Sequence, residues 1–142
     1  MSDTALATPR HIWIVGILSL LWNSMGAMDY TVTRLKLIEL PDAQLDYINA
    51  FPVWASAGWA LGVWGAFAGS ILLLMRSQYA VAAFGLSLAG MLVSLLWRFV
   101  LSGVDEAAIL GGSPYPLAAI IFIVAVALFL YARKQKASGV LR

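Results

Sequence analysis

The polar side chains inside the apolar stretches of this chain are the ones that could do chemistry. Asn23 lies near the middle of the first apolar stretch, Asp29 near its end, and Arg98 directly after the apolar run that ends at Trp97. A buried amide needs hydrogen-bond partners, and a charge inside a membrane helix is costly unless it is paired. We therefore expect Asn23 to point into a helix bundle, and Asp29 to pair with Arg98 and join the first and third helices. A gate or proton site is the alternative role for that pair.

Three tryptophans lie on the second apolar stretch, at Trp54, Trp59 and Trp64. Tryptophan prefers the membrane interface, which suits Trp54 near the start of the stretch. Trp59 and Trp64 lie deeper, where they provide packing bulk beside small residues. The alternative interpretation is an aromatic wall around an apolar or sugar-like ligand.

Sequence motifs for catalysis or metal binding are absent. The chain has no cysteine and one histidine, His11, so it cannot build a cysteine-ligated or multi-histidine metal site. It has no nucleophile elbow, zinc-protease helix, phosphate loop or dinucleotide loop. Asp105 and Glu106 are adjacent, and on a helix they would point about 100° apart, so we interpret them as part of a solvated loop. The sequence predicts no enzyme activity, no catalytic residue, no metal and no cofactor.

The composition excludes most soluble classes of protein. Of 142 residues, 62% are hydrophobic and 11% are charged, with a formal net charge of +2. A soluble domain is roughly 25% charged, and a nucleic-acid-binding domain is usually strongly basic. We expect residues 1–142 to form a single transmembrane domain that contacts the lipid bilayer and no nucleic acid.

Four stretches have the length and composition of membrane-spanning helices, at about residues 11–30, 51–75, 79–101 and 116–131. A helix needs about 20 mostly apolar residues to cross the bilayer. The predicted fold is an all-α integral membrane four-helix bundle. Pro41 followed by Asp42 predicts a short outer amphipathic helix between the first two spans, with Leu45 and Ile48 on one face. A cleaved secretory signal is the less favoured interpretation of the first stretch.

Glycines recur along the second stretch at a helical spacing. Intervals of four, three and four residues place them on one stripe, and small residues allow membrane helices to approach closely. We expect this stripe to pack within the chain, with a second protomer as the alternative partner. The stripe consists of Gly58, Gly62, Gly65 and Gly69, and the expected packing face of the third stretch is Ala82, Gly85 and Ala89.

The basic residues predict the orientation of the spans. Lysine and arginine favour the cytoplasmic side of the membrane. Both termini are therefore expected in the cytoplasm, at the bacterial inner membrane. The predicted inner side carries Arg10, Arg76, Arg133, Lys134, Lys136 and Arg142, and the outer side Arg34, Lys36 and Arg98.

Five segments carry a resemblance to a known family: LLWNSMG at 20–26, LPDAQ at 40–44, FPVW at 51–54, GAFAGSILLL at 65–74 and ARK at 132–134. With them the chain resembles, over nearly its whole length, a family of small four-span bacterial inner-membrane proteins that often carry an automatic "sugar transporter" label. The resemblance implies the four-span topology and says little about activity.

Two functions agree with these observations. The favoured one is a non-catalytic inner-membrane protein, either an accessory subunit of a larger complex or a self-associating bundle. The alternative is a small-solute transporter, with sugars among its candidate solutes, that acts as an oligomer. Polar residues facing a central cavity would favour transport, whereas an interface of glycine, alanine and aromatic residues without a cavity would favour the accessory function.

Overall fold

Four apolar stretches form the long helices of the protein, and each is long and apolar enough to cross a membrane. In the computed structural model, which describes residues 7–142, these helices are α1 (Arg10–Arg34), α3 (Val53–Leu74), α4 (Tyr79–Leu96) and α6 (Tyr115–Ala137). A π-helical turn, η1 (Trp97–Leu101), continues α4. No strand occurs among the described residues. The all-α, four-helix class predicted from the sequence is confirmed, and the chain is a multi-pass membrane protein.

Two of the long helices extend further than the apolar runs alone predict. α1 continues to Arg34, and α6 continues through its basic segment to Ala137. Lysine and arginine are good helix formers, and positive charge near a helix C-terminus interacts favourably with the helix dipole. Such residues lie in the last turn of both helices, Arg34 in α1 and Lys134 and Lys136 in α6, so the helices continue past the residues that the bilayer requires.

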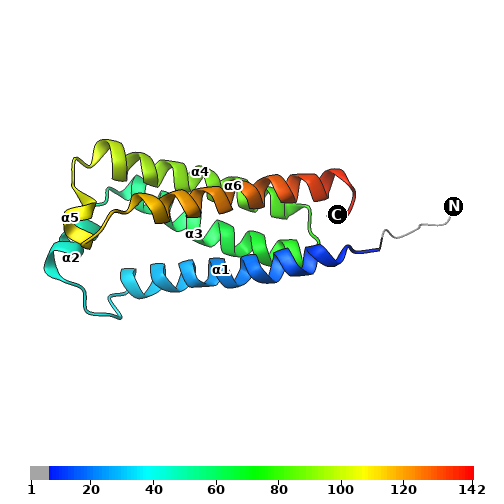
Figure 1. Cartoon of the computed structure of the whole chain (residues 1–142), viewed down its shortest axis with the longest axis horizontal. Helices are drawn as coiled ribbons and strands as arrows, with labels where there is room; N and C mark the ends of the chain where they lie inside the picture. Colours follow the sequence, from blue (N-terminus) through cyan, green and yellow to red (C-terminus); the bar gives the residue numbers. More distant parts are fainter. Residues whose placement is uncertain (1–6) are drawn as a thin grey trace.

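The four long helices run side by side and define two ends of the molecule (Figure 1). The short helices α2 (Asp42–Asn49) and α5 (Glu106–Leu110) lie at one end, which we call the loop end. The start of α1, the α3–α4 turn and the C-terminus lie at the other, which we call the terminal end. α3 packs against α1 on one side and most extensively against α4, and α6 packs against α4. Extensive backbone contact between α1 and α6 is absent.

The glycine stripe of α3 faces α4 within the same chain. A Cβ atom added at Gly58 would lie 2.8 Å from the carbonyl oxygen of Gly90, and one added at Gly65 would lie 3.0 Å from Cβ of Ser87. Small residues on both helices therefore allow the backbones to touch. The expected α4 face of Ala82, Gly85 and Ala89 is wrong, because Ala82 and Ala89 are exposed. The buried α4 face is Ala80, Phe84, Ser87, Gly90 and Ser94.

The buried serines of α4 explain why the sequence predicted a different packing face for this helix. A serine is nearly as small as alanine, and its hydroxyl can be satisfied by a backbone carbonyl inside a membrane protein. The hydroxyl of Ser87 donates to the carbonyl of Gly62 at 2.5 Å, which adds a polar link between α3 and α4 at the closest approach.

An apolar cluster closes the terminal end. The hydroxyl of Tyr131 and Nδ1 of His11 share a hydrogen bond of 2.5 Å that joins α6 to α1. The C-terminal residue Arg142 forms two backbone hydrogen bonds with the α3–α4 turn, one with Arg76 and one with Gln78. These links seal the bundle beneath its core of Ile12, Leu73, Ala80, Phe84, Leu128, Ala132 and Leu141.

The two short helices cover the loop end. The predicted outer helix is present as α2, and it buries Tyr47, while Leu45 and Ile48 are half-buried. α5 lies in a segment that we expected to be a loop. The carboxylate of Asp105 caps α5 by accepting from the backbone N–H groups of Ala107 and Ala108. Tyr47 and Trp97 share a small second core with Ala55, so α2 is packed onto the bundle.

Candidate functional site

A buried ion pair lies at the loop end, between η1 and α5. Nε of Arg98 donates to Oε1 of Glu106 at 2.8 Å, and Nη2 of Arg98 donates to Oε2 at 2.7 Å. The hydroxyl of Tyr47 on α2 also donates to Oε1 of Glu106. The side chain of Glu106 is 2% exposed and that of Arg98 is 27% exposed. The two-pronged contact joins α2, α5 and η1 into one unit.

The expected pairing of Asp29 with Arg98 is therefore wrong. Arg98 forms its salt bridge with Glu106, and this is the only salt bridge among residues 7–142. The predicted pair rested on the similar depth of Asp29 and Arg98 in their spans, and Glu106 was expected in a solvated loop. A π-helical turn and the fold of α5 over the bundle bring Glu106 to Arg98, and neither follows from hydropathy.

The surroundings of Glu106 shift its ionisation. Burial raises the pKa of the Glu106 carboxyl, but hydrogen bonds from Arg98 and Tyr47 and the charge of Arg98 outweigh burial, so the net shift is downward. Burial and the neighbouring carboxylate of Glu106 together raise the pKa of Tyr47 above its ordinary value. Glu106 is thus held as a carboxylate and Tyr47 as a neutral hydrogen-bond donor.

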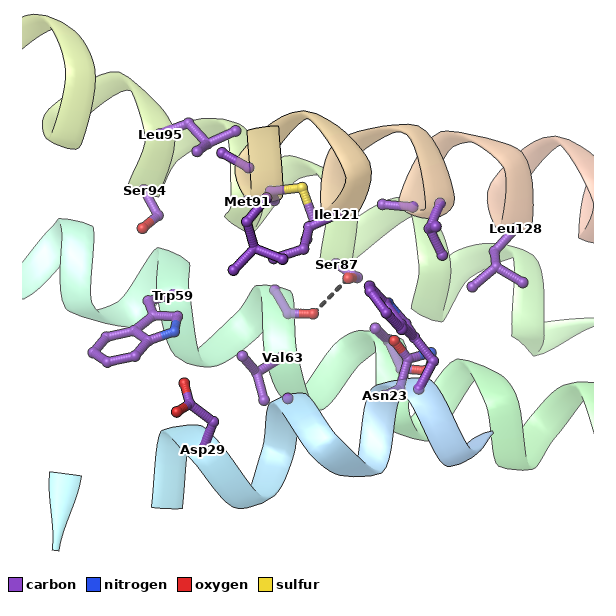
Figure 2. A pocket seen from close by; sticks show the side chains of 18 of the residues that line it. Asn23, Asp29, Trp59, Val63, Ser87, Met91, Ser94, Leu95, Ile121 and Leu128 are labelled. Carbon is purple, nitrogen blue, oxygen red and sulfur yellow. Dashed lines mark hydrogen bonds between the residues drawn. The ribbon is translucent and has the colours of Figure 1, made fainter. Parts of the chain in front are cut away.

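A cavity of about 340 Å³ lies among the four long helices. This volume falls in the lower part of the range of small-molecule sites. Figure 2 shows side chains from all four helices pointing into it. Asn23 and Asp29 come from α1, Trp59 from α3, Ser94 from α4, and Leu128 from α6.

The lining of the cavity changes in polarity along its length. Asp29, Ser94 and the indole of Trp59 lie toward the loop end (Figure 2). Arg98, which also lines the cavity, lies on η1, the turn that continues α4 at this end. Beyond this end the lining is largely apolar, with Phe84, Ile121, Val124, Ala125 and Leu128. Asn23 and Ser87 also line this part, but the amide of Asn23 and the hydroxyl of Ser87 both donate hydrogen bonds to α3. Phe84 and Leu128 also belong to the sealed core, so the cavity ends there. The arrangement matches a molecule with one polar end and an apolar body.

The opening of the cavity lies between α1 and α6. Met25 of α1 and Leu117 of α6 line the cavity and are 65% and 59% exposed. These two helices do not pack extensively on each other, and a Cβ atom at Gly26 would meet nothing within 4 Å. Such a gap faces the acyl chains of a bilayer, so a lipid-soluble molecule can reach the cavity sideways.

The other candidate residues differ in whether they line the cavity. Nδ2 of Asn23 donates to the hydroxyl of Ser70 at 2.8 Å and to the carbonyl of Ala66 at 3.2 Å, so Asn23 links α1 to α3 as well as lining the cavity. Of the three tryptophans on α3, Trp59 lines the cavity. Trp54 and Trp64 are 45% and 44% exposed and lie outside the cavity lining.

Several residues of the ion pair and of the cavity were not predicted from the sequence. Glu106 and Tyr47 lie in segments that were interpreted by polarity alone, and Ser94 and Trp22 lie in apolar runs. A usable signal existed for Glu106: Asp105 and the glycines at 111 and 112 mark a capped helical turn beside the arginine. No comparable signal marks Ser94, because one serine in a membrane helix is ordinary.

Comparisons with known proteins found no relative of this chain from which a function could be inferred. No family model matches the chain, and neither a curated protein nor a solved structure shows a significant match. Within residues 7–142, no group of three histidine, cysteine, aspartate or glutamate side chains is placed to hold a metal ion.

Proposed function

We propose that this protein is an inner-membrane protein that binds a small amphiphilic molecule in the cavity between its four spanning helices. The observation that carries the proposal is the cavity itself, which has a polar loop end, an apolar body and a lateral opening. Binding of this kind is the first step of the small-solute transport that the sequence left as an alternative. It needs no catalytic residue and no cofactor.

The closed terminal end of the bundle limits how a solute could cross the membrane through this protein. The core around Phe84 and Leu128 and the link between His11 and Tyr131 close the path in that direction. A carrier must expose its site to each side in turn, so transport would require this core to part. The α3 glycines are occupied by α4 within the chain, so this surface gives no support for self-association.

The first prediction concerns orientation. We propose that both termini lie in the cytoplasm, because six of the nine basic residues fall on that side of the spans. Reporter fusions after Met75 and after Arg142 should both give cytoplasmic signals. A periplasmic signal at either position would contradict this topology.

The second prediction tests whether the cavity holds a molecule. Ala125 lines the cavity from α6, and Ala127 is exposed on the same helix. Ala125→Phe should fill the cavity and prevent binding, whereas Ala127→Phe adds the same ring on the surface of the helix. Native mass spectrometry of protein purified in mild detergent should show a retained small molecule in wild type and Ala127→Phe, and little in Ala125→Phe. Equal retention by all three proteins would place the molecule outside the cavity.

A further inference from the structure

Within residues 7–142, the carboxylate of Asp29 has no salt-bridge or hydrogen-bond partner, and its side chain is exposed at the polar end of the cavity. Residues 7–142 contain one salt bridge, between Arg98 and Glu106, and it leaves Asp29 out. Figure 2 shows the side chain of Asp29 extending from α1 toward Trp59. Its backbone continues as helix to Arg34, so Asp29 belongs to the bundle wall and not to a connecting loop.

The charges around the cavity do not cancel. Nε and Nη2 of Arg98 both donate to Glu106, so that pair is neutral as a unit. Asp29 is then the uncompensated charge at the cavity, and the sign is negative. Although the side chain of Asp29 is exposed, the cavity that it borders is lined mainly by apolar residues, and a low effective dielectric constant on that side strengthens its attraction for a cation in the cavity.

An aromatic face lies beside the carboxylate. Trp59 lines the cavity, and its ring is held by edge contact with Tyr30, at 4.9 Å between centroids, and by Phe51 at 5.7 Å. The indole is the strongest cation–π acceptor among protein side chains. Because its neighbours fix the ring, little side-chain freedom is lost when a ligand binds.

From these observations we propose that the loop end of the cavity binds an organic cation, with Asp29 as counter-ion and Trp59 as the aromatic face. The proposal deepens the proposed function and rests on it. The ligand class is an organic ammonium with an apolar body, and the body lies along Ile121, Val124 and Leu128.

Three probes of one shape test the charge preference. Benzyltrimethylammonium is cationic, neopentylbenzene is its neutral isostere, and phenylmethanesulfonate is a similarly shaped anion. Calorimetric titration into protein in lipid nanodiscs, corrected with empty nanodiscs, gives each affinity. Wild type should bind the cation about tenfold or more tightly than the neutral isostere and should disfavour the sulfonate.

Two neutral variants of Asp29 and one control variant test whether Asp29 causes the preference for the cation. Asp29→Asn should bring the affinities for the cation and the neutral isostere close together while leaving the neutral affinity unchanged, and Asp29→Ser serves as a second neutral variant. Asp46→Asn removes one acid from the exposed side of α2 at the same end and should keep the full preference. A preference that persists without Asp29 would overturn the proposal.

The wild-type titrations separate two kinds of failure. If the neutral isostere binds and the cation binds no better, or if the sulfonate binds best, the cation proposal is wrong and the cavity still binds a ligand. If no probe binds and Ala125→Phe also changes nothing in native mass spectrometry, the proposed function is wrong as well.

Discussion

Glu106→Gln should lower the free energy of unfolding by about 2–3 kcal/mol, although it changes only one atom of the side chain. Removing one partner of a buried ion pair leaves the other charge uncompensated, which costs about 3–5 kcal/mol when both are fully buried. The side chain of Arg98 is 27% exposed, so part of that cost is relieved by solvent. Unfolding in mixed detergent micelles, followed by circular dichroism, measures the change.

Asp105→Asn is the matched control for this substitution. It removes the same charge from the neighbouring residue, and asparagine caps a helix about as well as aspartate, so α5 keeps its N-terminal cap. The control should change stability by only a few tenths of a kcal/mol. Equal losses at the two positions would mean that the net charge of the segment matters and the ion pair does not.

Acidification should reproduce the Glu106→Gln loss in wild type. The pKa of Glu106 is lowered in the folded protein below its ordinary value of 4.5. The carboxylate therefore contributes its full stabilisation above about pH 4.5, and the contribution is lost as the pH falls through the lowered folded pKa. Between wild type and Glu106→Gln, the stability difference should shrink as the pH falls below this range.

Gly90→Ala should lower the free energy of unfolding by about 2–3 kcal/mol, because α3 and α4 touch through their backbones at this point. A Cβ atom at Gly90 would lie 2.6 Å from the carbonyl oxygen of Gly58 and 2.9 Å from the backbone nitrogen of Gly62. Backbone atoms cannot turn aside as a side chain does, so the helices must separate. Thermal unfolding in detergent ranks the glycine variants by stability. Unfolding in mixed detergent micelles gives the change in the free energy of unfolding.

Two other glycines make this prediction specific. At Gly26 a Cβ atom would meet nothing, so Gly26→Ala should be neutral or stabilising by up to about 1 kcal/mol, the helix-propensity difference. At Gly62 the nearest atom would lie 3.4 Å away, which is ordinary contact, so Gly62→Ala should be tolerated. Similar losses at all three positions would show that the effect arises from helix flexibility and not from close packing.

The sequence by itself determined the class of protein and its spans. Apolar runs of membrane-spanning length have few folded alternatives, because backbone polar groups in a bilayer must be satisfied within helices. The glycine spacing on α3 likewise identified a close-packing surface, because a helix repeats every 3.6 residues. These properties depend on residues near one another in the chain.

Only the tertiary structure decided which side chains meet. Arg98 pairs with Glu106 and not with Asp29 because a π-helical turn and a short capped helix redirect the chain over the loop end. The cavity likewise arises from how α1 and α6 stand apart, and no residue type marks such a gap in a membrane-spanning sequence. Contacts between distant segments depend on helix rotation and on the path of the connections, and hydropathy constrains neither.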